Sequence, residues 1–159
     1  MVSKLHNIFV YGTLKKGEPN HHWFSIEEDN YYKFLCKAQT TERFPLIIAT
    51  KYNIPFLLYN PGMGNYIKGE VYKINEKVLN NLDSLEKHPS FYVRELYDVK
   101  RIDANAQNIK AWIYVMKNFK PELLHKPFFD DYSSEGAHGL KFATKFERDY
   151  DYRTEILLF

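Results

Sequence analysis

The chain has 159 residues, of which 45% are hydrophobic and 26% charged, with 13 Tyr, 12 Phe and 2 Trp among them. This composition excludes a disordered or collagen-like chain, and the length predicts a single domain spanning residues 1–159. Lysine and arginine number 22 against 20 aspartate and glutamate. That balance is not typical of nucleic-acid-binding domains, so we expect no nucleic-acid partner.

Cysteine usage and hydropathy indicate where the protein acts. Cys36 is the only cysteine, so no internal disulfide can form and a reducing, cytoplasmic environment is expected. The N-terminus lacks the apolar region of a signal peptide, and no apolar run approaches the roughly 18 residues of a membrane span, so we expect no membrane association. No patterned base accompanies Cys36, which is therefore interpreted as a structural thiol rather than a nucleophile.

Runs of β-branched and aromatic residues predict four strands in the first half of the chain. The expected strands are 8–11, 44–49, 54–59 and 69–74. The first ends abruptly at Gly12, and a short helix is expected over 21–29. A cluster of Gly, Pro and Asn at 60–65 predicts a turn before the fourth strand.

The strongest helix is predicted over 75–87. Asn75 is a favourable N-cap residue, and Pro89 disfavours helical geometry at the residue before it. Between them, four apolar residues form one stripe of the kind that packs on a core. The stripe consists of Val78, Leu79, Leu82 and Leu85.

Two β-rich segments follow this helix, at 91–102 and 109–116, and we expect them to pair as antiparallel neighbours. The tail at about 143–159 is charged and aromatic and is left unassigned. Strands outnumber helices and no βαβ alternation is sustained. The sequence therefore predicts the α+β class, with a curved or barrel-like mixed sheet.

The glycine-bounded loop at 12–17 follows a predicted strand, as a phosphate-binding loop would. That motif requires Lys followed by Ser or Thr, and the chain has Glu18-Pro19 instead, so the nucleotide interpretation fails. A turn at Gly12 can still present consecutive backbone N–H groups to a carboxylate or an oxyanion. The alternative is an ordinary turn in which Gly12 supplies a positive φ.

Glu86 prolongs the apolar stripe of the predicted helix rather than facing water. It lies in the last helical turn, where the helix dipole disfavours a carboxylate. Partial burial and the dipole both raise a carboxyl pKa toward the range that a general base or acid requires. The alternative is a residue at the edge of the stripe that pairs with Arg94 or a lysine.

The chain offers no pattern for a metal or organic cofactor. Its six histidines lack the i, i+4 pairing of a zinc-binding helix, and a single cysteine cannot build a Cys/His cluster. No Gly-x-Ser-x-Gly elbow occurs either, so the sequence does not support a serine hydrolase of the α/β type.

Several ordered segments resemble the γ-glutamyl cyclotransferase-like superfamily, and within it the branch that acts on γ-glutamyl amines. The block at 8–21 resembles the Tyr-Gly-Thr-Leu signature of that superfamily. Supporting blocks lie at 44–48, 53–58, 68–72, 82–86 and 134–140, the last being Ser-Glu-Gly-Ala-His-Gly-Leu, and Tyr92 with Arg94 continues the likeness. Together they span about residues 8–142.

The resemblance implies a small mixed β-barrel with a few flanking helices. It implies that Glu86, in the Leu-Asp-x-x-Glu pattern, is the catalytic residue, and that Tyr11, Gly12, Thr13 and Leu14 bind substrate. The implied reaction converts a γ-glutamyl amine such as γ-glutamyl-ε-lysine, a product of isopeptide degradation, into 5-oxoproline and the free amine. No metal or cofactor is implied.

Two alternatives remain open at the level of sequence. The first is a cyclotransferase for γ-glutamyl α-amino acids or glutathione, and the second is a non-catalytic binding protein that retains the fold. Sequence leaves open whether Tyr92, Arg94 or Tyr132 line the pocket. We expect a monomer whose partner is a small molecule.

Overall fold

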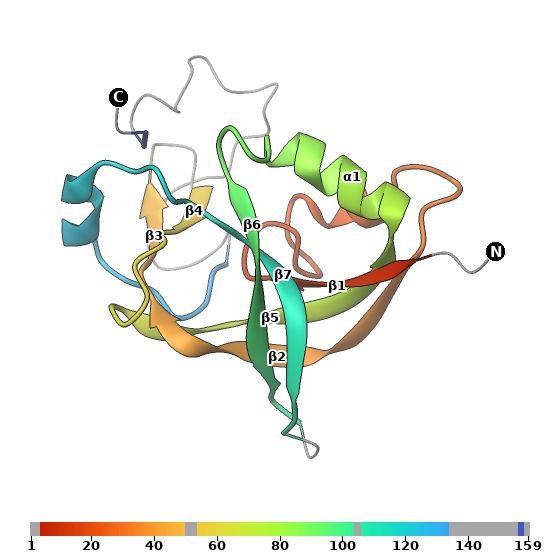
Figure 1. Cartoon of the computed structure of the whole chain (residues 1–159), viewed down its shortest axis with the longest axis horizontal. Helices are drawn as coiled ribbons and strands as arrows, with labels where there is room; N and C mark the ends of the chain where they lie inside the picture. The colour runs from red at the N-terminus through yellow and green to blue at the C-terminus, as the bar shows by residue number, and fades with distance from the viewer. Residues whose placement is uncertain (1–3, 50–53, 104–105, 134–155, 158–159) are drawn as a thin grey trace.

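Five strands close into a barrel in the computed structural model, which describes residues 4–49, 54–103, 106–133 and 156–157 (Figure 1). The order around the barrel is β1-β5-β2-β6-β7. The strands are β1 (Leu5–Val10), β2 (Tyr32–Phe44), β5 (Asn65–Asn75), β6 (Val93–Arg101) and β7 (Asn108–Val115). Neighbours pair antiparallel, except that β1 and β7 pair in parallel through Ile8 and Trp112. The expected small mixed barrel is thus confirmed.

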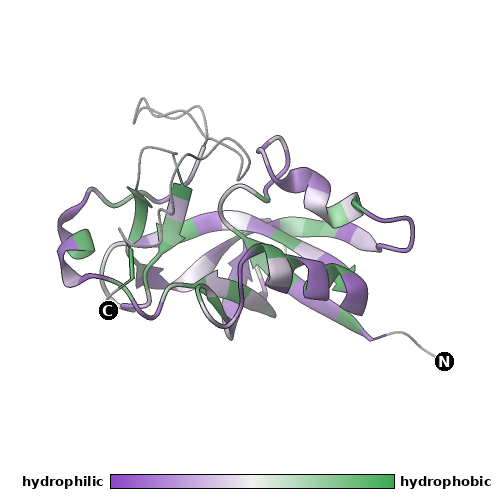
Figure 2. Cartoon of the chain, turned by 90° about the horizontal axis from the view of Figure 1, so that it is seen from above, coloured by the Kyte–Doolittle hydropathy of each residue, from purple (hydrophilic) through white to green (hydrophobic). Residues whose placement is uncertain are grey.

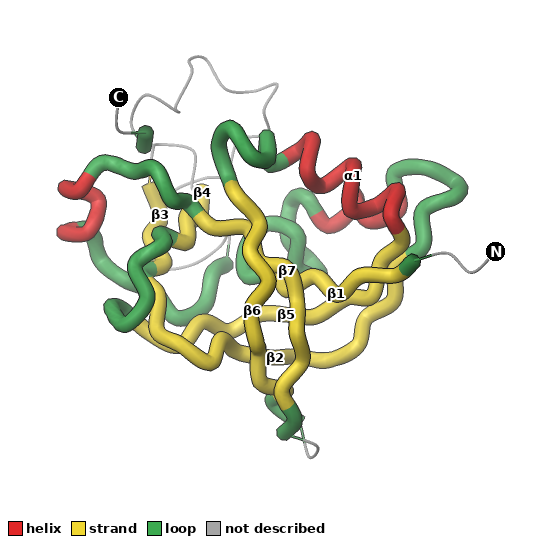
Figure 3. Tube along the Cα trace, viewed as in Figure 1, coloured by secondary structure: helices red, strands yellow, loops and turns green. Residues whose placement is uncertain are grey.

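The remaining elements lie around this barrel. A two-stranded antiparallel sheet is formed by β3 (Leu46–Ala49) and β4 (Ile54–Leu57). The α-helix α1 (Glu76–Leu85) lies beside the 3-10 helix η1 (His21–Ser25), and the second 3-10 helix η2 (Pro121–His125) lies near β3 and β4 (Figure 3). Within the described residues, no helix is long and apolar enough to cross a membrane.

Alternate side chains of β1, β5 and β7 enter two different cores, because successive residues of a strand point to opposite faces. In β1, Phe9 joins the barrel interior, whereas Ile8 and Val10 join the cluster that packs under α1. In β7, Ile113 is interior and Tyr114 packs outside with α1. Consecutive residues such as Ile8, Phe9 and Val10 can therefore all be hydrophobic and buried, and Figure 2 shows hydrophobic stretches beside hydrophilic ones on the ribbons.

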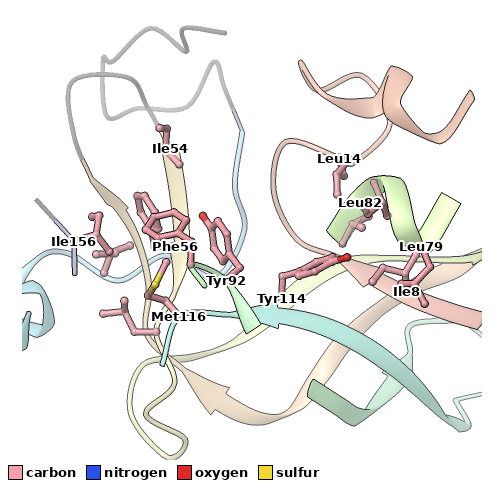
Figure 4. Close-up of a cluster of buried hydrophobic side chains, with 14 of the residues drawn as sticks. Ile8, Leu14, Ile54, Phe56, Leu79, Leu82, Tyr92, Tyr114, Met116 and Ile156 are labelled. Atoms are coloured by element: carbon pink, nitrogen blue, oxygen red, sulfur yellow. The ribbon is translucent and has the colours of Figure 1, made fainter. Parts of the chain in front are cut away.

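Helix α1 forms for the reasons that its sequence indicates. The Asn75 side chain accepts a hydrogen bond from the Val78 backbone N–H at 3.1 Å, which confirms it as the N-cap. Leu79 and Leu82 are buried with Val78 against the outer face of the barrel (Figure 4). The helix ends at Leu85, two residues earlier than expected, and Glu86 is its C-cap.

Strand β2 is the one long element that the sequence pattern did not predict. Its first three residues and residues 41–43 are exposed, and its register against β5 shifts between Phe34 and Cys36 and again between Gln39 and Arg43. Such irregularities break the alternation of polar and apolar residues that identifies a strand.

Two other expected elements differ from the structure. The helix expected at 21–29 is the shorter η1. The strand expected at 44–49 is divided, with Phe44 ending β2 and Leu46 beginning β3. Pro45 lies between them, and it has no backbone N–H to donate to a continuous ladder.

The packing of α1 can be tested with Leu82→Ala. Leu82 is fully buried, so the cavity left by its truncation should lower the free energy of unfolding by about 2–5 kcal/mol, measured by urea denaturation. Asn80→Ala is the control, because Asn80 is exposed on the same helix and should change that free energy by no more than about 0.5 kcal/mol. Equal losses from the two variants would contradict the assigned packing.

Candidate active site

The turn that follows β1, Tyr11–Leu14, has a buried residue at each end. Tyr11 donates a hydrogen bond from its hydroxyl to the backbone carbonyl of Tyr114 at 2.6 Å. Leu14 belongs to the cluster that packs under α1, together with Leu82 of that helix (Figure 4). Both ends of the Tyr11–Leu14 turn are therefore anchored to the body of the protein by buried contacts.

Gly12 is required for space rather than for an unusual backbone angle. A Cβ built on it would lie 2.8 Å from Pro55 Cγ on β4, closer than real side chains approach one another. Positive φ angles occur among the described glycines at Gly17, Gly62 and Gly64, but not at Gly12. The alternative interpretation that Gly12 supplies a positive φ is therefore wrong.

Three carbonyl groups of the turn accept hydrogen bonds. Gly12 O accepts from the Lys15 N–H at 3.1 Å, Thr13 O from the Asn20 N–H at 2.8 Å, and Leu14 O from His21 Nδ1 at 2.9 Å. The Asn20 side chain also donates to Thr13 Oγ1 at 2.9 Å.

Within the described part of the chain, the N–H groups of Gly12, Thr13 and Leu14 find no acceptor. The turn thus has the form that the anion-site hypothesis requires, with consecutive donors left available. Sequence reasoning did not single out Asn20 and His21 as supports, although both lie in the block that resembles the family signature.

Lys15 connects this turn to a segment near the end of the described chain. Its ammonium group donates to Asp131 Oδ1 at 2.7 Å and to the carbonyl of Tyr132 at 2.6 Å. Tyr132 is fully buried in the cluster of the barrel interior, and burial, with the nearby charge of Glu18, raises the pKa of its hydroxyl. The described contacts of Tyr132 are thus those of a core residue. The Ser-Glu-Gly-Ala-His-Gly-Leu block at 134–140 lies outside the described residues.

Glu86 is half-buried at the C-terminal end of α1. Burial, followed by the negative charge of Glu86, raises the pKa of the Tyr11 hydroxyl. Burial and Asp83 raise the pKa of Tyr114, and the charge of Glu86 raises it further. Tyr114 also bonds both Asp83 on α1 and the Tyr11 hydroxyl, so the fold ties the end of α1 to the first residue of the Tyr11–Leu14 turn.

The structure shows the contacts of Tyr92 and Arg94, whose roles the sequence left open. Tyr92 is buried, stacks on Phe56 with a ring separation of 5.9 Å, and donates its hydroxyl to the carbonyl of Pro55 at 3.0 Å. Arg94 binds Asp83 rather than Glu86, through Nε at 2.8 Å and Nη2 at 3.1 Å. Tyr92 thus fixes the Pro55 backbone opposite Gly12, and Asp83 is the carboxylate that neutralises Arg94.

Two further observations concern Cys36 and possible metal ligands among the described residues. Cys36 is buried in β2, and burial raises the pKa of its thiol, so its environment is that of a structural thiol. No three His, Cys, Asp or Glu side chains gather among the described residues in a way that could hold a metal ion.

A half-buried carboxylate at the end of α1 is thus connected through Tyr114 to a turn whose N–H groups have no acceptor among the described residues, and this arrangement defines the class of site. It is a small β-barrel enzyme site suited to general acid–base chemistry on a small molecule that carries an anionic group.

The comparison with known families makes this class specific. Residues 8–134 match the family model described as "Gamma-glutamyl cyclotransferase, AIG2-like". The chain belongs to this family.

Similar proteins span nearly the whole chain. Gamma-glutamylaminecyclotransferase C of Danio rerio is 42% identical over 149 residues, covering 92% of this chain and 98% of the relative. Gamma-glutamylaminecyclotransferase of Homo sapiens is 36% identical over 150 residues, covering 89% and 98%. The crystal structure of an AIG2-like protein from Mus musculus superposes with a TM-score of 0.85 at 38% identity, covering 91% of this chain and 99% of that one.

The close approach of Gly12 to Pro55 can be tested with Gly12→Ala. The added Cβ must displace Pro55 or the turn, and a displacement of this size in a positioned site should lower kcat/KM for 5-oxoproline formation by about 10–100-fold. Lys16→Ala is the matched control in the same loop, because the Lys16 side chain is exposed. Wild-type kinetics from Gly12→Ala would show that the contact does not position the turn.

Proposed function

We propose that the chain is a γ-glutamylamine cyclotransferase, which converts a γ-glutamyl amine such as γ-glutamyl-ε-lysine into 5-oxoproline and the free amine. Membership of the family and the names of the Danio rerio and Homo sapiens relatives support this function. The observation that carries the mechanism is the connection through Tyr114 between the last turn of α1, which is followed by Glu86, and the Tyr11–Leu14 turn.

The reaction is an intramolecular acyl transfer. The α-ammonium of the γ-glutamyl group loses a proton, and its nitrogen then attacks the γ-carbonyl carbon of the same group. The new C–N bond closes a five-membered lactam, and the bond to the amine breaks as the departing nitrogen takes up a proton. The attacking nitrogen loses a second proton to become the lactam N–H, and the free amine takes this proton up as an ammonium. Because both reacting groups belong to one molecule, the enzyme mainly holds the substrate in its folded-back conformation. The gain in rate from fixing the orientation of reacting groups can be large.

Glu86 is the proposed general base and acid. It accepts a proton of the α-ammonium and returns it to the departing nitrogen. It then takes the second proton of the attacking nitrogen and passes it to the free amine, so no proton is gained or lost overall. Its position at the C-terminal end of α1 supports this role, because the helix dipole and partial burial both destabilise a carboxylate and make it more basic.

Tyr11, Gly12, Thr13 and Leu14 are the proposed substrate-binding residues. The N–H groups of Gly12, Thr13 and Leu14 would hold the α-carboxylate of the substrate or the oxyanion that forms at the γ-carbonyl. The absence of a side chain at Gly12 lets Pro55 approach the turn. The Tyr11 hydroxyl is held by Tyr114 O, so its role is to fix the turn.

Glu86→Gln tests the mechanism, since it keeps the shape of the side chain and removes the base. We expect kcat for 5-oxoproline release from γ-glutamyl-ε-lysine to fall by about 10²–10⁴-fold, the usual contribution of one positioned acid–base group. Glu28→Gln is the control, because Glu28 is exposed and should leave kcat unchanged. A near wild-type rate from Glu86→Gln would sink the proposed role of Glu86.

Substrate preference separates this function from its two alternatives. We expect 5-oxoproline release to be fastest with γ-glutamyl-ε-lysine, compared at equal concentration with a γ-glutamyl α-amino acid and with glutathione. A higher kcat/KM for either of the latter would assign the chain to the other cyclotransferase activity. Absence of product from all three would favour a binding protein that retains the fold.

We further propose that the enzyme acts as a monomer in the cytoplasm on a small-molecule substrate, without a metal or cofactor. The single, buried Cys36 is compatible with a reducing compartment. Sedimentation of the active protein and its activity after dialysis against EDTA would test the oligomeric state and the independence from metal.

A further inference from the structure

A second carboxylate, Asp83, lies one helical turn before Glu86 and receives three hydrogen bonds. Arg94 donates two of them, at 2.8 and 3.1 Å, and the Tyr114 hydroxyl donates the third at 2.7 Å. The side chains of Asp83 and Arg94 are only 18% and 19% exposed. A bidentate pair with this degree of burial is far better defined in geometry than a surface ion pair.

Arg94 is also fixed from its other side. Its guanidinium carbon lies 4.3 Å from the ring centre of Trp112, within the range of a cation–π contact. Arg94 lies on β6, and Trp112 and Tyr114 lie on the neighbouring strand β7. The barrel therefore holds Arg94 rigidly, and Arg94 in turn holds the last turn of α1.

Tyr114 connects this network to the proposed substrate turn. Its hydroxyl donates to Asp83, while its backbone carbonyl accepts from the Tyr11 hydroxyl at 2.6 Å. One strand residue thus makes a bond to the helix that carries Glu86 and another to the residue that begins the Tyr11–Leu14 turn. A shift of either element would strain both bonds.

The backbone after Glu86 is tied to the same residues. The His88 N–H donates to the carbonyl of Asp83 at 2.9 Å, the Tyr92 N–H to the carbonyl of Glu86 at 3.3 Å, and the Arg94 N–H to His88 Nδ1 at 3.2 Å. Glu86 therefore lies inside a loop whose two ends are joined by the Asp83–Arg94 pair.

We propose that Asp83, Arg94 and Tyr114 are positioning residues for the cyclotransferase reaction: they hold Glu86 against the Tyr11–Leu14 turn and set the charge that its carboxylate experiences. This inference rests on the proposed function of Glu86 but assigns new roles to three other residues. None of the three needs to touch the substrate for this role.

The charges around Glu86 make the proposal specific. Asp83 on the same helix is a like charge and makes Glu86 more basic, whereas Arg94 on β6 makes it less basic. The charge of Glu86 also reaches Tyr11, which follows β1, and Tyr114 on β7, and Lys87 and His88 are the titratable residues that follow it in the chain. In the intact pair Asp83 and Arg94 largely cancel, so the removal of one exposes the effect of the other.

Asp83→Asn and Arg94→Gln should therefore shift the pH dependence of kcat/KM in opposite directions. The acidic limb reports Glu86, because the base must be ionised to accept the proton of the ammonium. Asp83→Asn leaves Arg94 unpaired, lowers the pKa of Glu86 and moves the limb to lower pH. Arg94→Gln leaves Asp83 unpaired and moves the limb to higher pH, each by about one pH unit.

Tyr114→Phe isolates the positioning role, since it keeps the ring and both charges and removes one hydrogen bond. We expect kcat to fall by about tenfold with KM changed less than about threefold, and the acidic limb to move less than in the two charge variants. It also keeps the proposal testable if either charge variant fails to fold, which circular dichroism would reveal.

Asp98→Asn and Lys110→Gln are matched controls, because Asp98 and Lys110 form an ion pair at 3.1 Å on the same two strands but in an exposed position. They should leave kcat and the acidic limb unchanged. If Asp83→Asn and Arg94→Gln only lower the thermal midpoint, or move the limb in the same direction, the pair is merely structural and the proposal is overturned. Activity that survives Glu86→Gln would instead overturn the proposed function, so the two failures are distinguishable.

Discussion

The parallel pairing of β1 with β7 is the contact on which the candidate site depends. It closes the barrel through Ile8 and Trp112, and it brings the end of β1 to Tyr114, whose carbonyl binds the Tyr11 hydroxyl across 103 positions of sequence. Without this closure, the Tyr11–Leu14 turn would have no fixed relation to α1. Because a closed barrel has no free edge on which to slide, the turn is held in register on both sides.

The site is built between two cores rather than inside one. Tyr11 belongs to the cluster of the barrel interior, whereas Leu14, Tyr114 and Leu82 belong to the cluster under α1. The turn that crosses between the clusters is therefore anchored at both ends by buried side chains, while the N–H groups of Gly12, Thr13 and Leu14 have no acceptor among the described residues. Such a division between rigid supports and available donors is what a preorganised site requires.

Local sequence patterns identified several parts of this arrangement correctly. The Asn75 cap and the apolar stripe through Leu82 predicted α1, because capping and helical periodicity depend on residues within one or two turns. The pairing of β6 with β7 was predicted for a similar reason. Strand β2 was not predicted, since its bulges are stabilised by β5 and leave no regular pattern in its own residues.

Sequence alone thus determined the residue types that the chemistry needs, a carboxylate at the end of a helix and a glycine turn after a strand. The resemblance to the γ-glutamyl cyclotransferase-like superfamily placed both in one site. Only the tertiary structure decided why Gly12 is a glycine, through the approach of Pro55, and which carboxylate pairs with Arg94. The physical reason is separation along the chain. Propensity, capping and periodicity act over a few residues, whereas close approach, ion pairing and burial depend on strands that meet only when the barrel closes.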